Sequence, residues 1–256
     1  MEHFTEDTRA HDVQGMFTRI ASRYDVMNRL MTAGQDVRWR RDVIRLARPG
    51  PGHRLLDLGA GTGDLAREAL RQQPACDVLA ADFTIEMMRI GRNKPPSTAP
   101  LRGSAQDARR EAEGRRTDRA PVMEWSAADA LRLPFPDAAF DAFVSGFLLR
   151  NVVDLRQALR EQHRVLKPNG RWVSLDTTRP RRNRLYPFIR FHLHHVIPTL
   201  GRLLTGQPDA YTYLPDSTES FLSAEDLAAR LRETGFREVE FSLRMFGTIA
   251  IHAAGK

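Results

Sequence analysis

Apolar and polar positions alternate in blocks along the chain, and the blocks predict alternating strands and helices. Apolar runs at 53–58, 77–82, 122–125, 140–145 and 171–176 predict buried strands, while helical spacing predicts helices at 64–73, 84–94 and 154–166. This order builds a parallel sheet with helices on both faces. A helix at 223–234 and two strands near 237–243 and 246–253 follow, and their short junction predicts an antiparallel hairpin at the sheet edge.

Three segments depart from this alternation within what we expect to be a single domain, residues 1–256. Apolar residues at helical spacing predict two helices within 13–48, and we interpret 1–48 as a helical cap. Residues 95–121 are rich in Pro, Ser, Ala, Arg and Glu, which predicts a flexible surface insertion. Residues 181–222 begin with Arg and His mixed among large apolar residues, which predicts a helical insertion that faces a substrate or a membrane, or alternatively a partner helix or dimer.

Charge and cysteine content limit the partners and the cellular compartment that we expect for this protein. The net charge of +7 and a pI near 10.2 favour an anionic partner, which could be nucleic acid, a membrane surface or an acidic ligand, or else the Arg-rich composition reflects only solubility and coding bias. A single cysteine, Cys76, allows no intramolecular disulfide and fits a reducing compartment, so we expect a cytoplasmic protein. No run approaches the ~20 apolar residues of a membrane-spanning helix, so any membrane contact would be peripheral.

A glycine-rich loop joins the first predicted strand to the next helix, in the stretch LLDLGAGTGDLA at 55–66. Alternate glycines let the backbone approach a ligand, and the following helix N-terminus points free amide groups at it. Asp82 ends the next predicted strand, nineteen residues after Gly63, where an acid can accept hydrogen bonds from a ribose diol. The candidate cofactor-binding residues here are Asp57, Gly59, Gly61, Thr62, Gly63 and Asp82.

Asp64 bears on the identity of the ligand. The dinucleotide fingerprint G-x-G-x-x-G would need glycine at this position, and a carboxylate would oppose a pyrophosphate. S-adenosylmethionine has a ribose and an adenine but a cationic amino group in place of phosphate. The alternative interpretation of Asp64 is an acid that favours the helix dipole.

Two further positions fall where the same ligand would extend. Asp129 and Ala130 lie just beyond the third predicted strand, where they could reach an adenine, although Asp129 could equally be a turn acid. Gly146 follows the fourth strand and leaves room beside a cofactor. Ligands in such sheets lie at the carboxyl ends of the strands.

These residues resemble the ubiquinone/menaquinone biosynthesis C-methyltransferases (UbiE/MenG type), which are class I S-adenosylmethionine-dependent methyltransferases. The resemblance covers nearly the whole chain. It rests on RYDVMN at 23–28, LDLGAGTGDL at 56–65, LPFPD at 133–137, FLLRNV at 147–152, RVLKP at 164–168 and the ending from 247 to 252. RYDVMN and FLLRNV together are the most specific of these.

The resemblance implies a Rossmann-like α/β fold, with a seven-stranded, mostly parallel sheet and an antiparallel edge strand. It implies S-adenosylmethionine as cofactor and a polyprenylated quinol as partner, in menaquinone or ubiquinone biosynthesis, with demethylmenaquinol our preferred acceptor. It also suggests cofactor contacts at Thr62, Asp82, Asp129, Ala130 and Gly146. The chain departs from the family at 175–178, where Leu-Asp-Thr-Thr replaces Leu-Glu-Phe-Ser, at Gly146, where serine is common, and in the length of 95–121.

Methyl transfer to a ring carbon needs alignment and a more nucleophilic ring, and it needs no metal. Arg150 and Asn151 follow the fourth strand and offer a cation and an amide donor, so we expect them to orient and polarise the acceptor. Arg150 could instead pair structurally with Asp176 or Asp154. Tyr24 is a third candidate catalytic residue, which could position a water or the quinol hydroxyl, or could be a core aromatic.

Two other functions compete with quinol methylation. The positive charge suits a nucleic-acid methyltransferase, but the fourth strand lacks the Asn/Asp-Pro-Pro-aromatic loop of amino-methylating enzymes, so we expect no nucleic-acid partner. A non-catalytic cofactor-binding assembly protein is the second rival, and the intact glycine loop with Asp82 and Arg150 argues against it. The three histidines His192, His194 and His195 we interpret as surface or membrane-facing residues.

Overall fold

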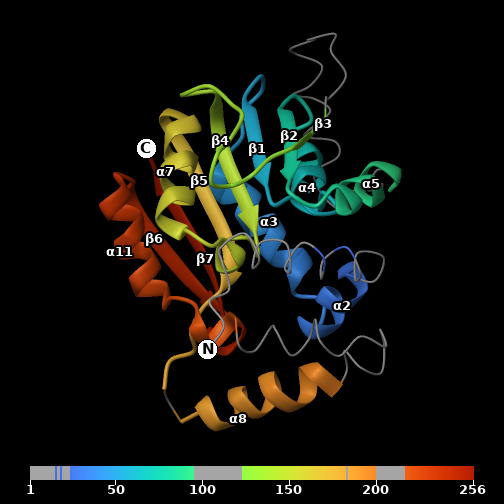
Figure 1. The fold of residues 1–256 in the computed structure, drawn as a ribbon, viewed down its shortest axis with the longest axis vertical. Helices are drawn as coiled ribbons and strands as arrows, with labels where there is room; N and C mark the ends of the chain where they lie inside the picture. The colour runs from blue at the N-terminus through green and yellow to red at the C-terminus, as the bar shows by residue number, and fades with distance from the viewer. Residues whose placement is uncertain (1–14, 16–17, 19–23, 95–122, 183, 200–216) are drawn as a thin grey trace.

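A seven-stranded sheet forms the centre of the protein in a computed structural model that describes residues 15, 18, 24–94, 123–182, 184–199 and 217–256 (Figure 1). The strand order is β3-β2-β1-β4-β5-β7-β6. Strands β1 to β5 pair in parallel, and β7 is antiparallel to both β5 and β6. The strands are β1 (Arg54–Leu58), β2 (Asp77–Asp82), β3 (Met123–Ala127), β4 (Phe140–Gly146), β5 (Leu166–Thr177), β6 (Arg237–Arg244) and β7 (Ile249–Gly255).

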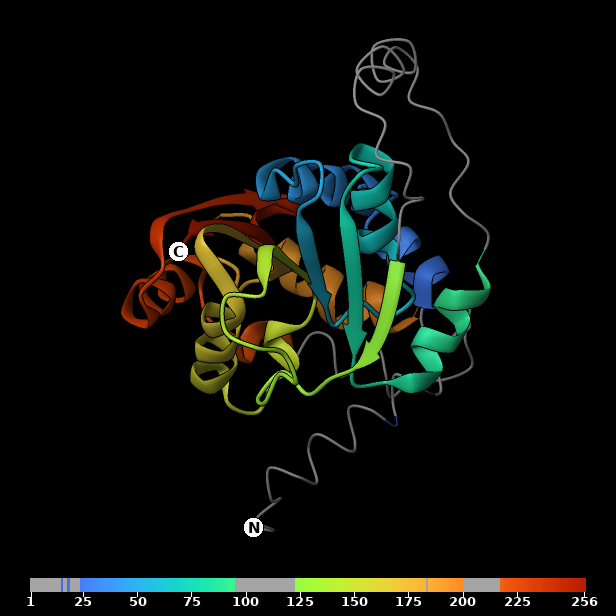
Figure 2. The same ribbon diagram turned by 90° about the horizontal axis from the view of Figure 1, so that it is seen from above.

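Helices cover both faces of this sheet (Figure 2). Helices α7 and α11 pack on one face, in a core that includes Phe143, Leu159 and Trp172. Helices α3 and α4 cover the other face around Trp39 and Leu65. The helices are α2 (Tyr24–Met31), α3 (Asp36–Ala47), α4 (Asp64–Gln72), α5 (Ile85–Asn93), α7 (Leu155–Val165), α8 (Tyr186–Phe191) and α11 (Ala224–Thr234), with short helical turns η1 (Leu149–Asn151), η2 (His192–Val196) and η3 (Met245–Gly247).

The predicted order of elements and the antiparallel hairpin of β6 and β7 at the sheet edge are confirmed. Strand β5 is longer than predicted: it starts at Leu166, which pairs with Phe140. Within it, Asn169 has a φ of 63°, and the register against β4 shifts between Phe140 and Ala142. Helices α2 and α3 lie within the predicted cap. Residues 1–14, 16–17 and 19–23 of the predicted cap, all of the 95–121 insertion and residues 200–216 lie outside the described residues.

The strand order reverses direction between β1 and β4, because the chain runs outward through β2 and β3 on one side and through β5 on the other. In open α/β sheets, ligands bind outside the carboxyl ends of the strands at this switch point. The loops after β1, β2 and β4 therefore converge where the sequence places its candidate residues.

Cys76 precedes β2 and is 1% exposed, and its thiol donates to the carbonyl of His53 at 3.2 Å. Burial raises the pKa of this thiol to about 12. Among the described residues, no helix combines the length and the apolar character that crossing a membrane requires.

Candidate functional site

The glycine loop leaves β1 at Leu58 and enters α4 at Asp64. Its three glycines, Gly59, Gly61 and Gly63, all have positive φ angles, between 55° and 80°. The backbone N–H groups of Gly59 and Ala60 donate to the carbonyl of Ala81 at 2.8 and 3.1 Å, so the loop is fastened to the end of β2. Side chains at these positions would be strained by the left-handed backbone, which explains the spacing that marked the loop in the sequence.

Asp57 lies on β1 directly beneath this loop and is 1% exposed. Its Oδ2 accepts the backbone N–H of Ala66 in α4 at 2.9 Å. Within the described chain, its other oxygen is buried without a hydrogen-bond partner. Burial raises the pKa of this carboxyl to about 7, and the negative charges of Asp82 and Asp64 add to the effect. A cationic group placed near Asp57 would therefore stabilise its ionised form.

Asp82 joins the loops that follow β1 and β2. Its carboxylate accepts the backbone N–H of Gly61 at 2.7 Å and that of Thr84 at 2.7 Å. Burial raises the pKa of Asp82, while these hydrogen bonds oppose the rise. The predicted ribose partner is thus at the carboxyl end of β2, beside the glycine loop.

Asp64 is the first residue of α4, as the helix-dipole interpretation requires. Its carboxylate lies 3.1 Å from Arg40, 3.4 Å from Arg67 and 3.4 Å from Lys94. Although burial opposes them, these cations hold the pKa of Asp64 below its usual value. Since the charge is compensated, Asp64 by itself would not repel a phosphate, so its carboxylate alone does not distinguish S-adenosylmethionine from a dinucleotide. The side chain of Thr62 is also directed to this cluster, where it accepts from Lys94 at 2.8 Å.

Gly91 and Trp125 hold the glycine loop in place, and sequence reasoning missed both. A Cβ atom at Gly63 would lie 2.7 Å from the Trp125 ring, and one at Gly91 would lie 2.4 Å from the same ring and 2.7 Å from the carbonyl oxygen of Thr62. Arg67 donates to the carbonyls of Gly91, at 3.1 Å, and Thr62. The close approach of α5 to the loop depends on these contacts, and no local pattern in the sequence signals them.

The other predicted cofactor positions lie along the same edge. Asp129 is exposed and its side chain accepts the N–H of Leu131 at 2.9 Å, which is a turn conformation. The N–H of Ala128 donates to the carbonyl of Asp82 at 3.1 Å, so the segment with Asp129 and Ala130 adjoins the end of β2. Gly146 is the last residue of β4, where a Cβ would lie 3.2 Å from Leu65.

Arg150 and Asp176 form a buried pair where β4 and β5 end. The Arg150 guanidinium lies 3.5 Å from Asp176, and Asp176 also accepts the backbone N–H groups of Leu149 at 2.7 Å and Arg150 at 3.4 Å. Burial raises the pKa of Asp176, while Arg150 opposes the rise. The pairing that we left open as an alternative for Arg150 is therefore present. The Nε of Arg150 is buried and has no hydrogen-bond partner among the described residues, so the pair does not use all of its donors.

Phe147 shapes the turn that carries these residues. It has a positive φ of 59°, an uncommon conformation for an aromatic residue, and the Arg150 guanidinium lies 5.2 Å from its ring centroid. The amide of Asn151 donates to the Phe147 carbonyl at 2.9 Å. Asn151 thus stabilises the turn that presents Arg150. Tyr24 is the first residue of α2, and its side chain lies outside the described part of the structure.

The histidine segment lies beyond β5. His194 Nε2 is 3.1 Å from a carboxylate oxygen of Glu219, and the rings of His195 and Phe191 stack. Among the described residues, no group of three or more His, Cys, Asp or Glu side chains could hold a metal ion.

Comparison with known proteins gives consistent results at the levels of family, sequence and structure. The model of the ubiE/COQ5 methyltransferase family matches residues 4–256. The chain is 43% identical to the ubiquinone/menaquinone biosynthesis C-methyltransferase UbiE of Desulfotalea psychrophila, over 94% of this chain and 88% of that protein. It is 40% identical to the demethylmenaquinone methyltransferase of Thermus thermophilus, over 94% of this chain and 100% of that protein.

Among solved structures, an S-adenosylmethionine-dependent methyltransferase from Thermotoga maritima, described as a possible histamine N-methyltransferase, superposes with a TM-score of 0.59 at 16% identity. The match covers 94% of this chain and 99% of that one. At this identity the likeness shows the fold, which is that of the class I methyltransferases.

Proposed function

Because the chain belongs to the ubiE/COQ5 methyltransferase family, we propose that it transfers a methyl group from S-adenosylmethionine to a ring carbon of a polyprenylated quinol. The relatives' names indicate the acceptor class, a demethylmenaquinol or the corresponding ubiquinone precursor. Demethylmenaquinol is our preferred acceptor.

The residues at the carboxyl edge fit this cofactor. Asp57 carries a buried oxygen without a partner in the described chain, which suits a nearby cationic amino group. Asp82 lies where a ribose diol could share its carboxylate, and the glycine loop keeps backbone N–H groups free of side chains. Asp57, Gly59, Gly61, Thr62, Gly63, Asp82, Asp129, Ala130 and Gly146 are the proposed cofactor-binding residues.

S-adenosylmethionine, when bound, supplies an electrophilic methyl group on a sulfonium. The part of Arg150 is to hold a fixed positive charge beside the acceptor's hydroxyl oxygen, which favours its ionisation as the proton passes to a base or a water relay. The resulting phenolate carries more electron density on the adjacent ring carbon than the neutral hydroxyl form does. Asp176 limits the rotamers of Arg150 and sets the position of η1 through its two backbone hydrogen bonds. Asn151 supports the same turn, and Tyr24 remains a candidate for contact with the quinol hydroxyl.

The observation that carries this proposal is the buried Arg150–Asp176 pair at the carboxyl ends of β4 and β5, in a chain of this family. The test is to incubate the protein with methyl-labelled S-adenosylmethionine and, separately, demethylmenaquinol, a benzoquinol precursor and RNA. We expect label in a quinol. Transfer to RNA alone would favour a nucleic-acid methyltransferase, and cofactor binding without transfer would favour the assembly protein.

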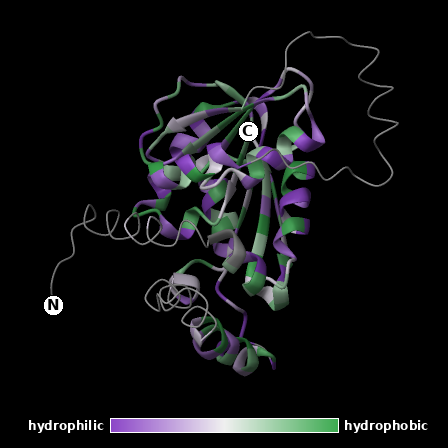
Figure 3. Ribbon diagram, turned by 90° about the vertical axis from the view of Figure 1, so that its right-hand side faces the viewer, coloured by the Kyte–Doolittle hydropathy of each residue, from purple (hydrophilic) through white to green (hydrophobic). Residues whose placement is uncertain are grey.

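We further propose that α8 makes a peripheral contact with an anionic membrane. Its inner face packs through Ile189, with Leu193 and Ile197 following in the next turns, against Met31 of α2. Its outer face exposes Phe188 (74%) and Phe191 (59%). Of the nearby arginines, Arg181 pairs with Glu225 and Arg190 lies 3.8 Å from Glu219, while Arg182 and Arg184 are exposed. These cations suit insertion of the aromatic side chains among acidic lipid headgroups. Figure 3 shows apolar residues on this helix at the margin of the molecule.

A further inference from the structure

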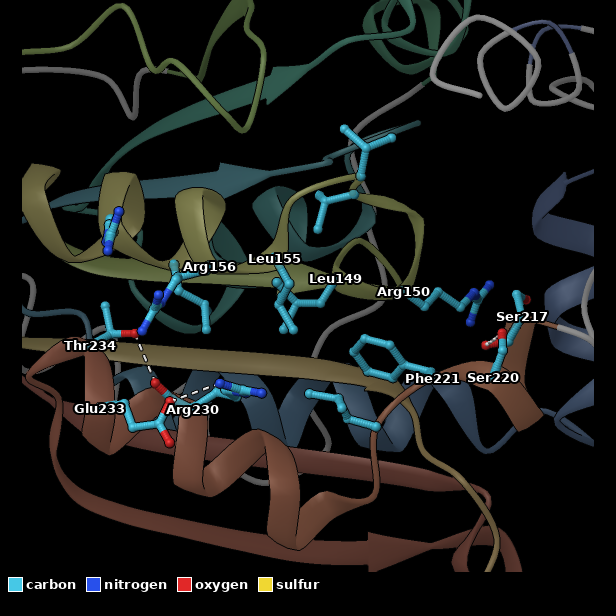
Figure 4. A pocket seen from close by; sticks show the side chains of 15 residues that line it. Leu149, Arg150, Leu155, Arg156, Ser217, Ser220, Phe221, Arg230, Glu233 and Thr234 are labelled. Carbon is cyan, nitrogen blue, oxygen red and sulfur yellow. Dashed lines mark hydrogen bonds and ion pairs between the residues drawn. The ribbon is translucent and has the colours of Figure 1, made fainter. Parts of the chain in front are cut away.

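A groove separates α7 from α11 on one face of the sheet, and neither the proposed methyl transfer nor the predicted cofactor contacts account for it (Figure 4). Its volume is about 540 Å³, within the range of ligand pockets. Both helices run back from the carboxyl edge of the sheet, so the groove is elongated along them. Arg150 lines one end, Leu149 lies nearer the middle beside Leu155, and Thr234 lies at the other end.

The lining changes character along the groove. Beside Arg150 it includes the hydroxyls of Ser217 and Ser220. Leu155 and Phe221 lie between the two ends, and Leu159 and Leu222 are among the other apolar residues of the lining. Charged groups gather at the distant end, where Arg230 pairs with Glu233 at 3.0 Å.

Such a lining suits an uncharged hydrocarbon chain. The apolar middle section gains free energy when it covers apolar surface, whereas the polar and charged side chains at the two ends of the groove can stay hydrated. The arginines at the distant end are exposed, so their aliphatic stems can cover a chain while the guanidinium groups stay in water.

The position of the groove indicates which hydrocarbon chain it would bind. Arg150 belongs both to the groove and to the buried pair at the carboxyl edge. A ring held at Arg150 therefore has the apolar section of the groove directly beside it. We propose that this groove binds the ring-proximal isoprene units of the acceptor's polyprenyl tail. This inference rests on the proposed quinol methylation and adds a second binding determinant to it.

The groove is separate from the outer face of α8. Membrane contact through Phe188 and Phe191 would bring the protein to the substrate, whereas the groove would hold part of the tail against protein. The two surfaces can be tested separately. Vesicle binding measures the contact made by α8, whereas the dependence of kcat/KM on tail length, measured in uniform detergent micelles, tests the groove.

The test is a tail-length series in which demethylnaphthoquinols carry no tail, or one, two or four isoprene units. For the unmodified protein we expect kcat/KM to rise with each of the first units and then level off. Leu155→Trp and Leu222→Trp fill the apolar part of the groove, and we expect each to lower kcat/KM for the four-unit quinol at least tenfold. Transfer to the tail-free quinol should stay within twofold.

Leu70→Trp is the matched control, because Leu70 is a half-buried leucine of α4 on the opposite face of the sheet. It should leave the tail-length dependence unchanged. Equal loss for tailed and tail-free quinols, with folding retained by circular dichroism, would overturn the groove proposal. Methyl transfer by the unmodified protein to no quinol at all would instead contradict the proposed function.

A second measurement covers the case in which the tryptophan variants do not fold. The unmodified protein is irradiated with a quinol whose second isoprene unit carries a photoreactive group, and the crosslinked peptides are identified by mass spectrometry. Crosslinks within 149–160 and 217–234 are expected. Crosslinks confined to 184–199 would overturn the proposal.

Discussion

The Arg150 guanidinium lies 3.5 Å from the buried carboxylate of Asp176, and that carboxylate also accepts the backbone N–H groups of Leu149 and Arg150. One acid at the end of β5 therefore fixes both the backbone and the charge of the turn after β4. Each partner of a buried pair is costly to remove alone, because the other charge is left without compensation.

Arg150→Ala is expected to lower kcat about 100-fold or more, since it removes the cation proposed to stabilise the phenolate. Affinity for S-adenosylmethionine, measured by isothermal titration calorimetry, should change less than twofold. Asp176→Asn is the control for displacement of the turn, because asparagine keeps an acceptor for the Leu149 N–H. If Asp176→Asn loses as much kcat as Arg150→Ala although the turn and the Arg150 charge are retained, the charge acts only when Asp176 orients it.

Asp57→Asn is expected to stabilise the ligand-free protein at high pH. The pKa of Asp57 rises from 3.8 to about 7 on folding, so the folded state binds this proton more tightly than the unfolded state does. The stability that the protonated carboxyl contributes is fully present below pH 4 and is lost as pH rises through about 7. Asparagine resembles the protonated form, so the gain over wild type should be small at pH 4 and reach about 2–4 kcal/mol at pH 8.

Urea denaturation at the two pH values measures this difference. A gain that did not depend on pH would show that Asp57 does not titrate as proposed. Cofactor affinity should move the opposite way, because the variant lacks the charge offered to the cationic amino group.

Gly91→Ala is expected to destabilise the protein by about 1–3 kcal/mol, since the new methyl group would overlap the Trp125 ring and the Thr62 carbonyl. Trp125→Leu should rescue it only in part, because the backbone carbonyl remains. Gly146→Ala is the comparison: its Cβ would meet only the movable side chain of Leu65, at 3.2 Å. Gly146→Ala should lower the affinity for the cofactor, and it should lower the free energy of unfolding measured with denaturant by less than about 1 kcal/mol.

The double variant Phe188→Ser/Phe191→Ser is expected to weaken binding to vesicles that contain anionic lipid at least tenfold, because it removes the aromatic side chains that would insert. Cosedimentation at low and high salt measures this. Phe246→Ser is the matched control, since Phe246 is 76% exposed but lies on η3, outside α8. Equal effects of the two changes would contradict a specific role for α8.

Local patterns were sufficient for most of the fold and for part of the site. Apolar runs marked the strands because parallel strands covered on both faces are nearly all apolar, and glycine spacing marked a loop whose φ angles only glycine adopts easily. Asp82 was found because the length of a strand-helix-strand unit brings the second strand's end beside the first.

Features that depend on contacts between residues far apart in the sequence could not be predicted from local patterns. Gly91 and Trp125 meet only because β2 and β3 are neighbours, and the compensation of Asp64 comes from Arg40 and Lys94 on other elements. The pairing of Arg150 with Asp176 was one of two alternatives until the register of β4 against β5 decided it. Leu155 and Leu222 have the sequence pattern of ordinary core residues, so the groove between their helices was missed.

The burial of Cys76 makes the protein suited to site-specific spectroscopy. Its thiol is hidden and its pKa of about 12 keeps it protonated at neutral pH, so it should react slowly with maleimides. A cysteine introduced at Arg156, at the rim of the groove, would then be the dominant target for a fluorophore. Such a reporter would allow the entry of a prenyl chain to be followed in time, and Cys76 would not have to be replaced first.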